Sequence, residues 1–265
     1  MKPFYEIIDE ICKEKNIEQS ELSYGWIKRL TKDGVSRNII RNQLEINGAI
    51  AYTVAGDKYA TYEVLSEHNI PVILHKIVFN PVTRKGYGEE DFIASAIQFF
   101  EENNQKVVIK ANNSYAGKDV YLCDKKEEIS EIIEKLFHEN NNTLSMLPYL
   151  DIDYEYRATY LYGEIIYIYK KGKTESWKHN LCNGATPILI DNTDEYVETV
   201  KSIAKQAGDA ININFANIDI ALTSDKKMLV MEINKNVCMN KFVELVPNGY
   251  EIAKEIYAKA IDKMF

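Results

Sequence analysis

Residues 215–236, FANIDIALTSDKKMLVMEINKN, contain two apolar runs around a polar turn centred on Asp225 and Lys226. The first run contains Phe, Ala, Ile and Leu, and the second contains Met, Leu, Val and Ile. Apolar runs of this length on either side of a polar turn are typical of paired strands, so the stretch predicts a β-hairpin. The position of the turn predicts three cross-strand pairs: Asp219 with Glu232, Ala221 with Val230, and Thr223 with Met228.

Side chains of a strand alternate between its two faces, so the hairpin should have one apolar and one polar face. The expected core face consists of Ile218, Ile220, Leu222, Leu229, Met231 and Ile233. The opposite face consists of Asp219, Ala221, Val230, Glu232 and Asn234. Two carboxylates opposed at about 5 Å repel each other by about 3 kcal/mol at an effective dielectric constant of about 20. Mg²⁺ or Mn²⁺ held by Asp219, Glu232 and Asn234 would turn this repulsion into binding; alternatively, both acids are solvated on an exposed face.

A second informative stretch is VVIKANNSYAGKDVYL, residues 107–122. Its first run is β-branched and ends at Lys110, and small polar residues follow before a second apolar run begins. An ammonium group at the end of a buried strand is costly unless an anion meets it. Gly117 would let the loop backbone approach such an anion closely. The stretch therefore predicts an anion-binding loop, and the alternative is a plain hairpin loop with one lysine at its edge.

Composition limits the class of protein. The chain has 265 residues, of which 46% are hydrophobic, enough for one or two domains. A net charge of −8 argues against a broad nucleic-acid-binding surface, and no apolar run approaches the roughly 20 residues that span a membrane. Four scattered cysteines without a Cys-X-X-Cys motif favour neither a disulfide framework nor a zinc site, and they fit a reducing cytoplasm. The Walker motif GxxxxGK[ST] is absent.

Helical and strand patterns alternate along the chain and predict an α/β or α+β protein. Helices are expected over 1–14, 57–69, 89–103, 125–137, 194–207 and 248–265. Strands are expected over 72–79, 143–147, 156–162 and 165–170, with a further hairpin that turns at Asp33-Gly34. Three domains are expected: a short N-terminal domain over 1–55, a central subdomain over 56–145 that carries the anion-binding loop, and a C-terminal subdomain over 146–265 that carries the acidic hairpin.

Five segments, in order, resemble the ATP-grasp superfamily. They are AGDKYATYEVLSEHNIPV (55–72), VVIKANNSYAGKDV (107–120), MLPYLDIDYEYRATYL (146–161), WKHNLCNGA (177–185), and NIDIAL with LVMEIN (217–222 and 229–234). The similarity is to carboxylate–amine ligases of the glutathione-synthetase and ribosomal-protein glutamate-ligase kind, and NGAIAYTVAGDKYAT (47–61) is similar to cyanophycin synthetases. The resemblance runs from about residue 47 to the C-terminus and implies an α+β ATP-grasp fold, in which two α/β subdomains clasp ATP.

The resemblance also implies roles for individual residues. For ATP these are Lys58, Lys110, Ser114, Gly117 and Lys178 at the phosphates, Leu147 and Tyr149 at the adenine through their main chains, and Glu155 at the ribose. Lys178 and Asn180 would reach the γ-phosphate and Arg157 the carboxylate substrate, and Asp219, Glu232 and Asn234 would hold Mg²⁺. Arg157 could instead form a structural salt bridge, and Lys58 could be a solvated lysine at a helix start.

The implied activity is ATP-dependent joining of a carboxylate to an amine through an acyl phosphate, with an amino acid or peptide as substrate. The rival is an ATP-binding module that acts through a partner, and a carboxylase or kinase-like phosphotransferase is a further alternative. Two departures concern the substrate side. KNVCMNKF (235–242) follows Asn234, where the family often has a small residue and then Pro-Gly, and the N-terminal domain is short. The substrates therefore stay open, and a second subunit in a homodimer could complete the pocket.

Overall fold

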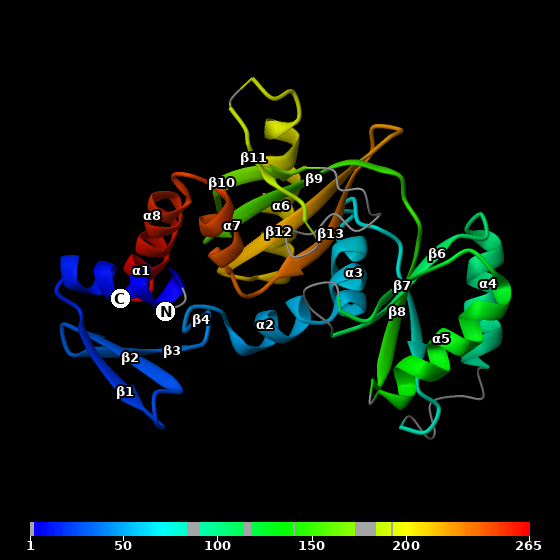
Figure 1. Cartoon of the computed structure of the whole chain (residues 1–265), viewed down its shortest axis with the longest axis horizontal. Helices are drawn as coiled ribbons and strands as arrows, with labels where there is room; N and C mark the ends of the chain where they lie inside the picture. The colour runs from blue at the N-terminus through cyan, green and yellow to red at the C-terminus, as the bar shows by residue number, and fades with distance from the viewer. Residues whose placement is uncertain (1–2, 84–90, 114–117, 140, 173–183, 192) are drawn as a thin grey trace.

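The computed structural model describes residues 3–83, 91–113, 118–139, 141–172, 184–191 and 193–265. Within these residues the chain forms helices and three antiparallel sheets, which makes it an α+β protein (Figure 1). The helices are α1 (Pro3–Glu14), α2 (Ala49–Ala55), α3 (Lys58–Glu67), α4 (Phe92–Glu102), α5 (Lys126–His138), α6 (Val197–Ile211), α7 (Asn240–Leu245) and α8 (Gly249–Asp262). No helix of the described part is both long and apolar enough to cross a membrane.

The strands of each sheet come from one part of the chain. The N-terminal sheet, in the order β1-β2-β3-β4, contains β1 (Glu18–Leu22), β2 (Ile27–Lys32), β3 (Val35–Ile40) and β4 (Gln43–Leu44). The second sheet, in the order β5-β8-β6-β7, contains β5 (Lys76–Phe79), β6 (Val107–Ala111), β7 (Val120–Cys123) and β8 (Thr143–Pro148). The central sheet, in the order β11-β10-β9-β12-β13, contains β9 (Ile152–Leu161), β10 (Glu164–Lys171), β11 (Pro187–Leu189), β12 (Phe215–Thr223) and β13 (Met228–Asn234).

The N-terminal helix forms as its apolar spacing predicts. Phe4, Ile7, Ile8 and Ile11 lie on one face of α1, and each is at most 1% exposed. The Phe4 ring meets the Tyr257 ring of α8 edge-on at 5.1 Å between centroids. The first and last helices therefore share one core, and the two chain termini lie near each other (Figure 1).

The hairpin of β2 and β3 turns at Asp33 and Gly34, as expected from the sequence. Both residues have positive φ angles, 49° and 80°, which is the backbone of a tight hairpin turn and suits Asp-Gly. The sheet that follows packs its apolar side, including Leu30 and Ile39, into the core that contains α1 and α8.

The second sheet lies at the opposite end of the molecule and is covered by α4 and α5 (Figure 1). The side chain of Asp91 caps α4 by accepting hydrogen bonds from the main-chain nitrogens of Ile93 and Ala94. Apolar side chains of both helices pack on β6 and β8 in a core that includes Phe100, Ile133 and Ile109. This arrangement holds the end of β6, and therefore Lys110, at the edge that faces the central sheet.

The central sheet has one apolar face, covered by α6 with α2 and α3. Part of its other face is covered by α7, where Phe242 packs on Tyr169 at 4.9 Å between ring centroids. Because α3 contributes Leu65 to the core of the central sheet, residues on both sides of the expected boundary at 56 share that core. The domain limits at 55/56 and 145/146 stay predictions.

The expected register of the acidic hairpin is right at one pair and wrong beyond it. Asp219 pairs with Glu232 as predicted, but Ile220 pairs with Val230 and Leu222 with Met228, because a β-bulge leaves Met231 as an extra residue. The predicted pairs Ala221–Val230 and Thr223–Met228 are therefore wrong. Val230 is fully buried in the core with Ile218, Ile220, Leu222 and Ile233, whereas Leu229 and Met231 lie on the opposite side.

The bulge has a cause outside the hairpin. The predicted strand over 72–79 begins only at Lys76, and Val72 instead makes a parallel bridge to Val230. The main-chain nitrogen of Val230 donates to Pro71 O (2.8 Å), and that of Ile73 donates to Val230 O (3.0 Å). These two hydrogen bonds fix Val230 from outside the hairpin. The sequence pattern also missed α2, α7, β1, β4 and β11, which are short or mostly polar.

Candidate active site

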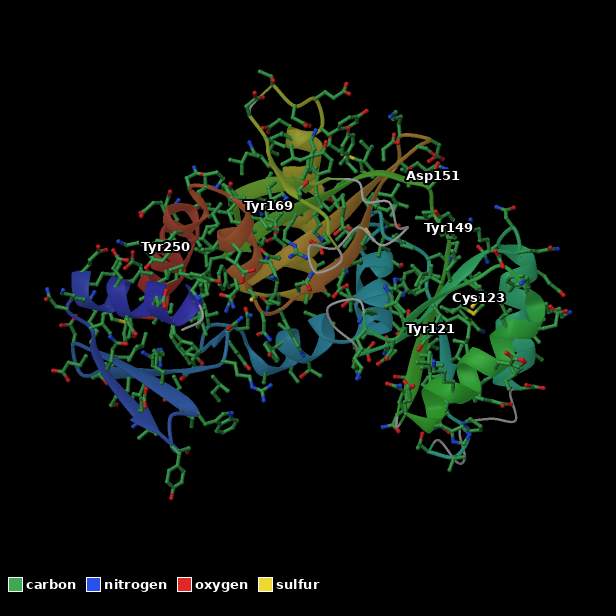
Figure 2. All side chains as sticks on the ribbon, viewed as in Figure 1. Tyr121, Cys123, Tyr149, Asp151, Tyr169 and Tyr250 are labelled. Carbon is green, nitrogen blue, oxygen red and sulfur yellow. The ribbon has the colours of Figure 1, made fainter. Side chains whose placement is uncertain are left out.

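An apolar cluster joins the second sheet to the central sheet. Its buried members are Ile73, Val108 and Leu147, and the partly buried residues packed on them are Val120, Leu122, Tyr149, Leu150, Leu229 and Met231. The chain passes from one sheet to the other through Tyr149 and Asp151, which Figure 2 labels at this crossing. The bulge in β13 is what turns Leu229 and Met231 toward this cluster. The cluster thus connects the two sheets through apolar side chains of both.

Leu147 and Tyr149, expected at the adenine, both lie in this cluster. The main-chain N–H of Tyr149 donates to Lys106 O (2.9 Å), so it is already used within the second sheet. The Lys106 ammonium lies 4.0 Å from the centre of the Tyr149 ring. The contact with adenine through main-chain atoms stays a prediction.

Lys110 lies beside the apolar cluster, near the end of β6, directly opposite Ser145 on β8. Burial lowers the pKa of Lys110 to about 8; the charge of Glu232 opposes this shift and that of Lys58 adds to it. Next to it, buried His75 shares a hydrogen bond with Ser145 Oγ at 2.5 Å. Burial, followed by the charges of Lys110 and Lys58, holds the pKa of His75 well below its usual range. His75 is therefore a neutral side chain close to Lys110 and Lys58.

Lys58 is buried and joins α3 to the start of the anion-binding loop. Its Nζ donates to Asn112 O (3.1 Å), and Asn112 Oδ1 accepts from the main-chain nitrogen of Tyr59 (3.1 Å). Burial lowers the pKa of Lys58, whereas the charges of Glu232 and Asp57 raise it. The solvated alternative for Lys58 is excluded, because its exposed fraction is 9%. Asn112 Nδ2 is fully buried and meets no hydrogen-bond acceptor within the described residues, so this amide has an unused donor there at the start of the loop.

Glu232 belongs to β13 of the central sheet and lies near these lysines. Its charge acts on Lys58, Lys110 and Arg157, yet among the described residues it accepts no hydrogen bond. Asn234, two residues further along β13, donates from Nδ2 to Asp219 Oδ2 (3.1 Å) and leaves its Oδ1 without a donor within the described structure. A carboxylate and an amide oxygen of one strand thus lie close together without partners.

Asp219 is compensated by cations, which changes the expectation of a strong repulsion with Glu232. Arg157 binds it through two hydrogen bonds, Nε to Oδ1 (2.7 Å) and a terminal guanidinium nitrogen to Oδ2 (2.6 Å). Lys171 Nζ donates to the same Oδ2 (2.9 Å) and also to buried Glu155. Burial opposes the ionisation of Asp219, but Arg157 and Lys171 outweigh it and hold the pKa at about 2. The structural ion pair considered for Arg157 is therefore present.

The strand registers explain how these charges meet. In the central sheet Glu155 pairs with Lys171 on one side, and Arg157 pairs with Asp219 on the other. Residues 155 and 157 lie on the same face of β9 because side chains alternate. Of the expected site residues, Ser114, Gly117, Lys178 and Asn180 lie outside the described residues. The others gather around the junction of the two sheets, although Glu155 and Asp219 are engaged by Lys171.

Sequence reasoning missed Lys171, Asn112 and His75. Lys171 could have been found, because the alternation in IIYIYKK places it on the same face as Tyr169 and opposite Glu155. Figure 2 labels Tyr169 on the central sheet. Its ring packs on that of Phe242. His75 and Asn112 carry no periodic signal, since each becomes significant only through partners distant in sequence.

Comparison with known proteins agrees with this geometry. A family model described as the RimK-like ATP-grasp domain matches residues 55–260. The chain belongs to the RimK-like ATP-grasp domain family. The ATP-grasp resemblance and the α+β ATP-grasp fold class expected from the sequence are thereby confirmed, and with them the assignment to ATP-dependent carbon–nitrogen ligases.

Individual relatives of this ATP-grasp chain are distant. It is 26% identical over 242 residues to the uncharacterized protein MG011 homolog of Mycoplasma pneumoniae, covering 91% of this chain and 75% of that one. It is 25% identical over 189 residues to human N-acetylaspartylglutamate synthase A, covering 68% of this chain and 43% of the synthase. The crystal structure of D-alanine–D-alanine ligase from Bacillus anthracis superposes with a TM-score of 0.62 at 16% identity, covering 82% of this chain and 68% of the ligase.

The donor set of the ATP-grasp chain fits a divalent cation in part. The described residues contain no group of three His, Cys, Asp or Glu side chains that could hold a metal. The expected set, however, consists of two carboxylates and an amide oxygen, which are ligands that Mg²⁺ accepts. Glu232 and Asn234 Oδ1 are open for such a role, whereas both oxygens of Asp219 are hydrogen-bonded to Arg157 and Lys171. To become a ligand of Mg²⁺, Asp219 would have to bind the metal with an oxygen that already accepts hydrogen bonds from Arg157 or Lys171.

Proposed function

We propose that this chain activates a substrate carboxylate with ATP and joins it to the amino group of an amino acid or peptide. The observation that carries the proposal is the gathering of Lys58, Lys110 and the Arg157–Asp219 ion pair near Glu232, whose carboxylate accepts no hydrogen bond among the described residues. Such a set of charges neutralises phosphates. An acyl-phosphate route needs only positioning and charge compensation from the protein.

The proposed roles are given in order along ATP, from the adenine to the phosphates. Adenine lies against the apolar cluster around Val108 and Leu147, and the phosphates extend past Lys110 and Lys58. Glu232 and Asn234, with Asp219 near them, would hold Mg²⁺, which neutralises phosphate charge when bound. The unused Nδ2 of Asn112 is a donor for a phosphate oxygen. Ser114, Gly117, Lys178 and Asn180 keep their expected roles as part of this proposal.

The chemistry has two steps. An oxygen of the substrate carboxylate attacks the γ-phosphorus of ATP, and ADP leaves with the electrons of the broken phosphoanhydride bond. The amine then attacks the acyl carbon of the acyl phosphate, loses a proton and releases inorganic phosphate. The name of the human relative, N-acetylaspartylglutamate synthase A, supports amino acids as substrates. The expected cytoplasmic location and the possible homodimer stay predictions.

A coupled assay tests the proposal. ADP release is measured over a panel of carboxylate and amino-acid pairs, and products are identified by mass. We expect one or more pairs to stimulate ADP release, and Glu232→Gln to lower the rate about 100-fold or more, as loss of one charge-stabilising group does in other enzymes. Glu198→Gln is the matched control, because Glu198 is exposed on α6 and, in the part of the chain that the structure describes, its ion pair is with neighbouring Lys201 alone. ATP binding without ADP release for any pair would instead favour the ATP-binding module.

A further inference from the structure

His75 lies on the face of the second sheet that carries Lys110. In this sheet Ser145 on β8 pairs with Lys110 on β6 on one side and with Ile77 on β5 on the other. Directly paired residues share a face of a sheet. His75 comes two residues before Ile77, and its Nδ1 lies 2.5 Å from Ser145 Oγ. His75 and Ser145 are 5% and 0% exposed, so water does not compete for their hydrogen bond.

Helix α3 connects His75 to the second lysine of the site. The Tyr62 ring on α3 lies over the His75 ring, with 5.7 Å between centroids and 34° between ring planes. Lys58 lies one helical turn before Tyr62, so both side chains project from the same side of α3. Near its other end α3 packs Leu65 into the core of the central sheet. Helix α3 therefore belongs to the core of the central sheet and contacts the second sheet and its loop at two places, Asn112 through Lys58 and His75 through Tyr62.

The two lysines of the site are held in different ways. Lys58 is fixed by its hydrogen bond to Asn112 O (3.1 Å), whereas the Lys110 side chain donates no hydrogen bond within the described residues. The polar neighbour of Lys110 across the strands is Ser145, whose hydroxyl is oriented by His75. Burial, followed by the charges of Lys110 and Lys58, keeps the pKa of His75 low and its ring neutral. A neutral Nδ1 accepts the Ser145 hydrogen, so Ser145 then presents only oxygen lone pairs to the cation of Lys110.

We propose that His75 is a positioning residue for ATP: through Ser145 it orients the side chain of Lys110 toward the phosphates. The inference rests on the proposed function, with adenine at the apolar cluster and the phosphates at Lys110 and Lys58. His75 itself is buried and acts through its neighbour, without touching the nucleotide. Binding of the phosphates should therefore depend on His75, whereas binding of the adenine should not. The ratio of the affinities for ATP and adenosine measures this difference.

The test measures the binding of ATP and of adenosine by calorimetry in the presence of Mg²⁺. His75→Phe keeps a ring under Tyr62 but cannot accept the Ser145 hydrogen. We expect it to weaken ATP binding about 10-fold, or about 1.4 kcal/mol, and adenosine binding less than about 2-fold. Ser145→Ala should have the same effect. The double variant His75→Phe/Ser145→Ala should lose no more than the larger single loss, because both changes remove the same hydrogen bond.

Two further variants sharpen the result. His75→Asn places an amide oxygen, which is an acceptor, at the position of Nδ1. It should restore most of the ATP affinity that His75→Phe loses, a rescue that a packing role would not produce, because Asn fills less space than Phe. His68→Phe is the matched control, because His68 is exposed at the end of α3 and its Nδ1 bonds to Val64 O (2.9 Å) of the same helix. It should leave both affinities unchanged.

The outcomes separate positioning from structure and from the reaction. Equal losses of ATP and adenosine binding in His75→Phe and Ser145→Ala would make His75 a structural residue of the second sheet and overturn the inference, as would unchanged ATP binding in both. Loss of ATP affinity alone, in a protein that releases no ADP with any substrate pair, supports the role of His75 and rejects the ligase proposal. A wild type that does not bind ATP overturns the inference together with the placement of ATP. If His75→Phe does not fold, Ser145→Ala decides by the same ratio.

Discussion

Asp219 and Glu232 face each other across one hairpin, yet the structure gives them different surroundings. Asp219 is 5% exposed and compensated by Arg157 and Lys171. Asp219→Asn leaves buried Arg157 without its anion and Lys171 with Glu155 alone, so the free energy of unfolding should fall by about 3–5 kcal/mol. Glu232→Gln removes a carboxylate that has no hydrogen-bond donor among the described residues, so it should change stability by less than about 1 kcal/mol. Urea unfolding of the apo proteins checks both; equal losses would contradict the assignment.

Lys110 illustrates a conflict between binding and stability. Its pKa is about 8 in the folded protein, against about 10.4 for an exposed lysine. Below pH 8 both states are protonated and the cost of burying the cation is complete. Between these two values the unfolded chain holds more protons, so the apo protein gains stability as pH rises. Lys110→Met should therefore stabilise the apo protein by about 1–3 kcal/mol at pH 7 and by less at pH 9.5.

Lys110→Met should stabilise the apo protein but weaken its binding of ATP. Lys110→Met should weaken ATP binding by about 10-fold or more, because a charge-assisted contact with phosphate is lost. Calorimetry and thermal melts of the same samples measure both effects. A variant that melts lower than the wild type at pH 7 would show that Lys110 is a structural residue.

At the scale of elements, the sequence predicts what is local. The periodic apolar spacing of α1 and the Asp33-Gly34 turn are encoded within a few residues, and both are confirmed. The Asp219–Glu232 pair also follows from the turn. The bulge at Met231 does not, because Val230 is fixed by a hydrogen bond that it donates to Pro71 O and one that its own carbonyl accepts from Ile73, about 160 residues earlier in the sequence.

The same distinction applies to the site. The strand-end lysine, the paired acids and the apolar hinge segment are visible in short stretches of sequence. The pairing of Arg157 with Asp219 was open, since it depends on which strands become neighbours: β9 lies beside β12 only after α6 returns the chain. The role of Asn112 as a link between α3 and the anion-binding loop depends likewise on a contact over 54 residues with Lys58.

At the scale of the whole molecule, the first and last segments form one core. Residues of α1 and of the N-terminal sheet pack with α7, α8 and part of the central sheet, where β9, β10 and β12 contribute Leu161, Tyr169 and Phe215. We therefore expect α1 and α8 to unfold together, although the sequence suggested a separate N-terminal domain over 1–55. Ile8→Ala, at a fully buried position, should lower the free energy of unfolding by about 2–5 kcal/mol.

Hydrogen exchange in rising denaturant decides whether this unit is cooperative. The amides of α1 and α8 should lose protection at the same denaturant concentration, and Ile8→Ala should shift both by the same amount, because a shared core cannot open on one side alone. Ile50→Ala is the matched control, since Ile50 on α2 is 79% exposed and its loss should change stability by less than about 0.5 kcal/mol. If α1 opens in Ile8→Ala while α8 keeps its wild-type protection, the N-terminal segment is an independent domain and the shared core contributes little to holding the two ends of the chain together.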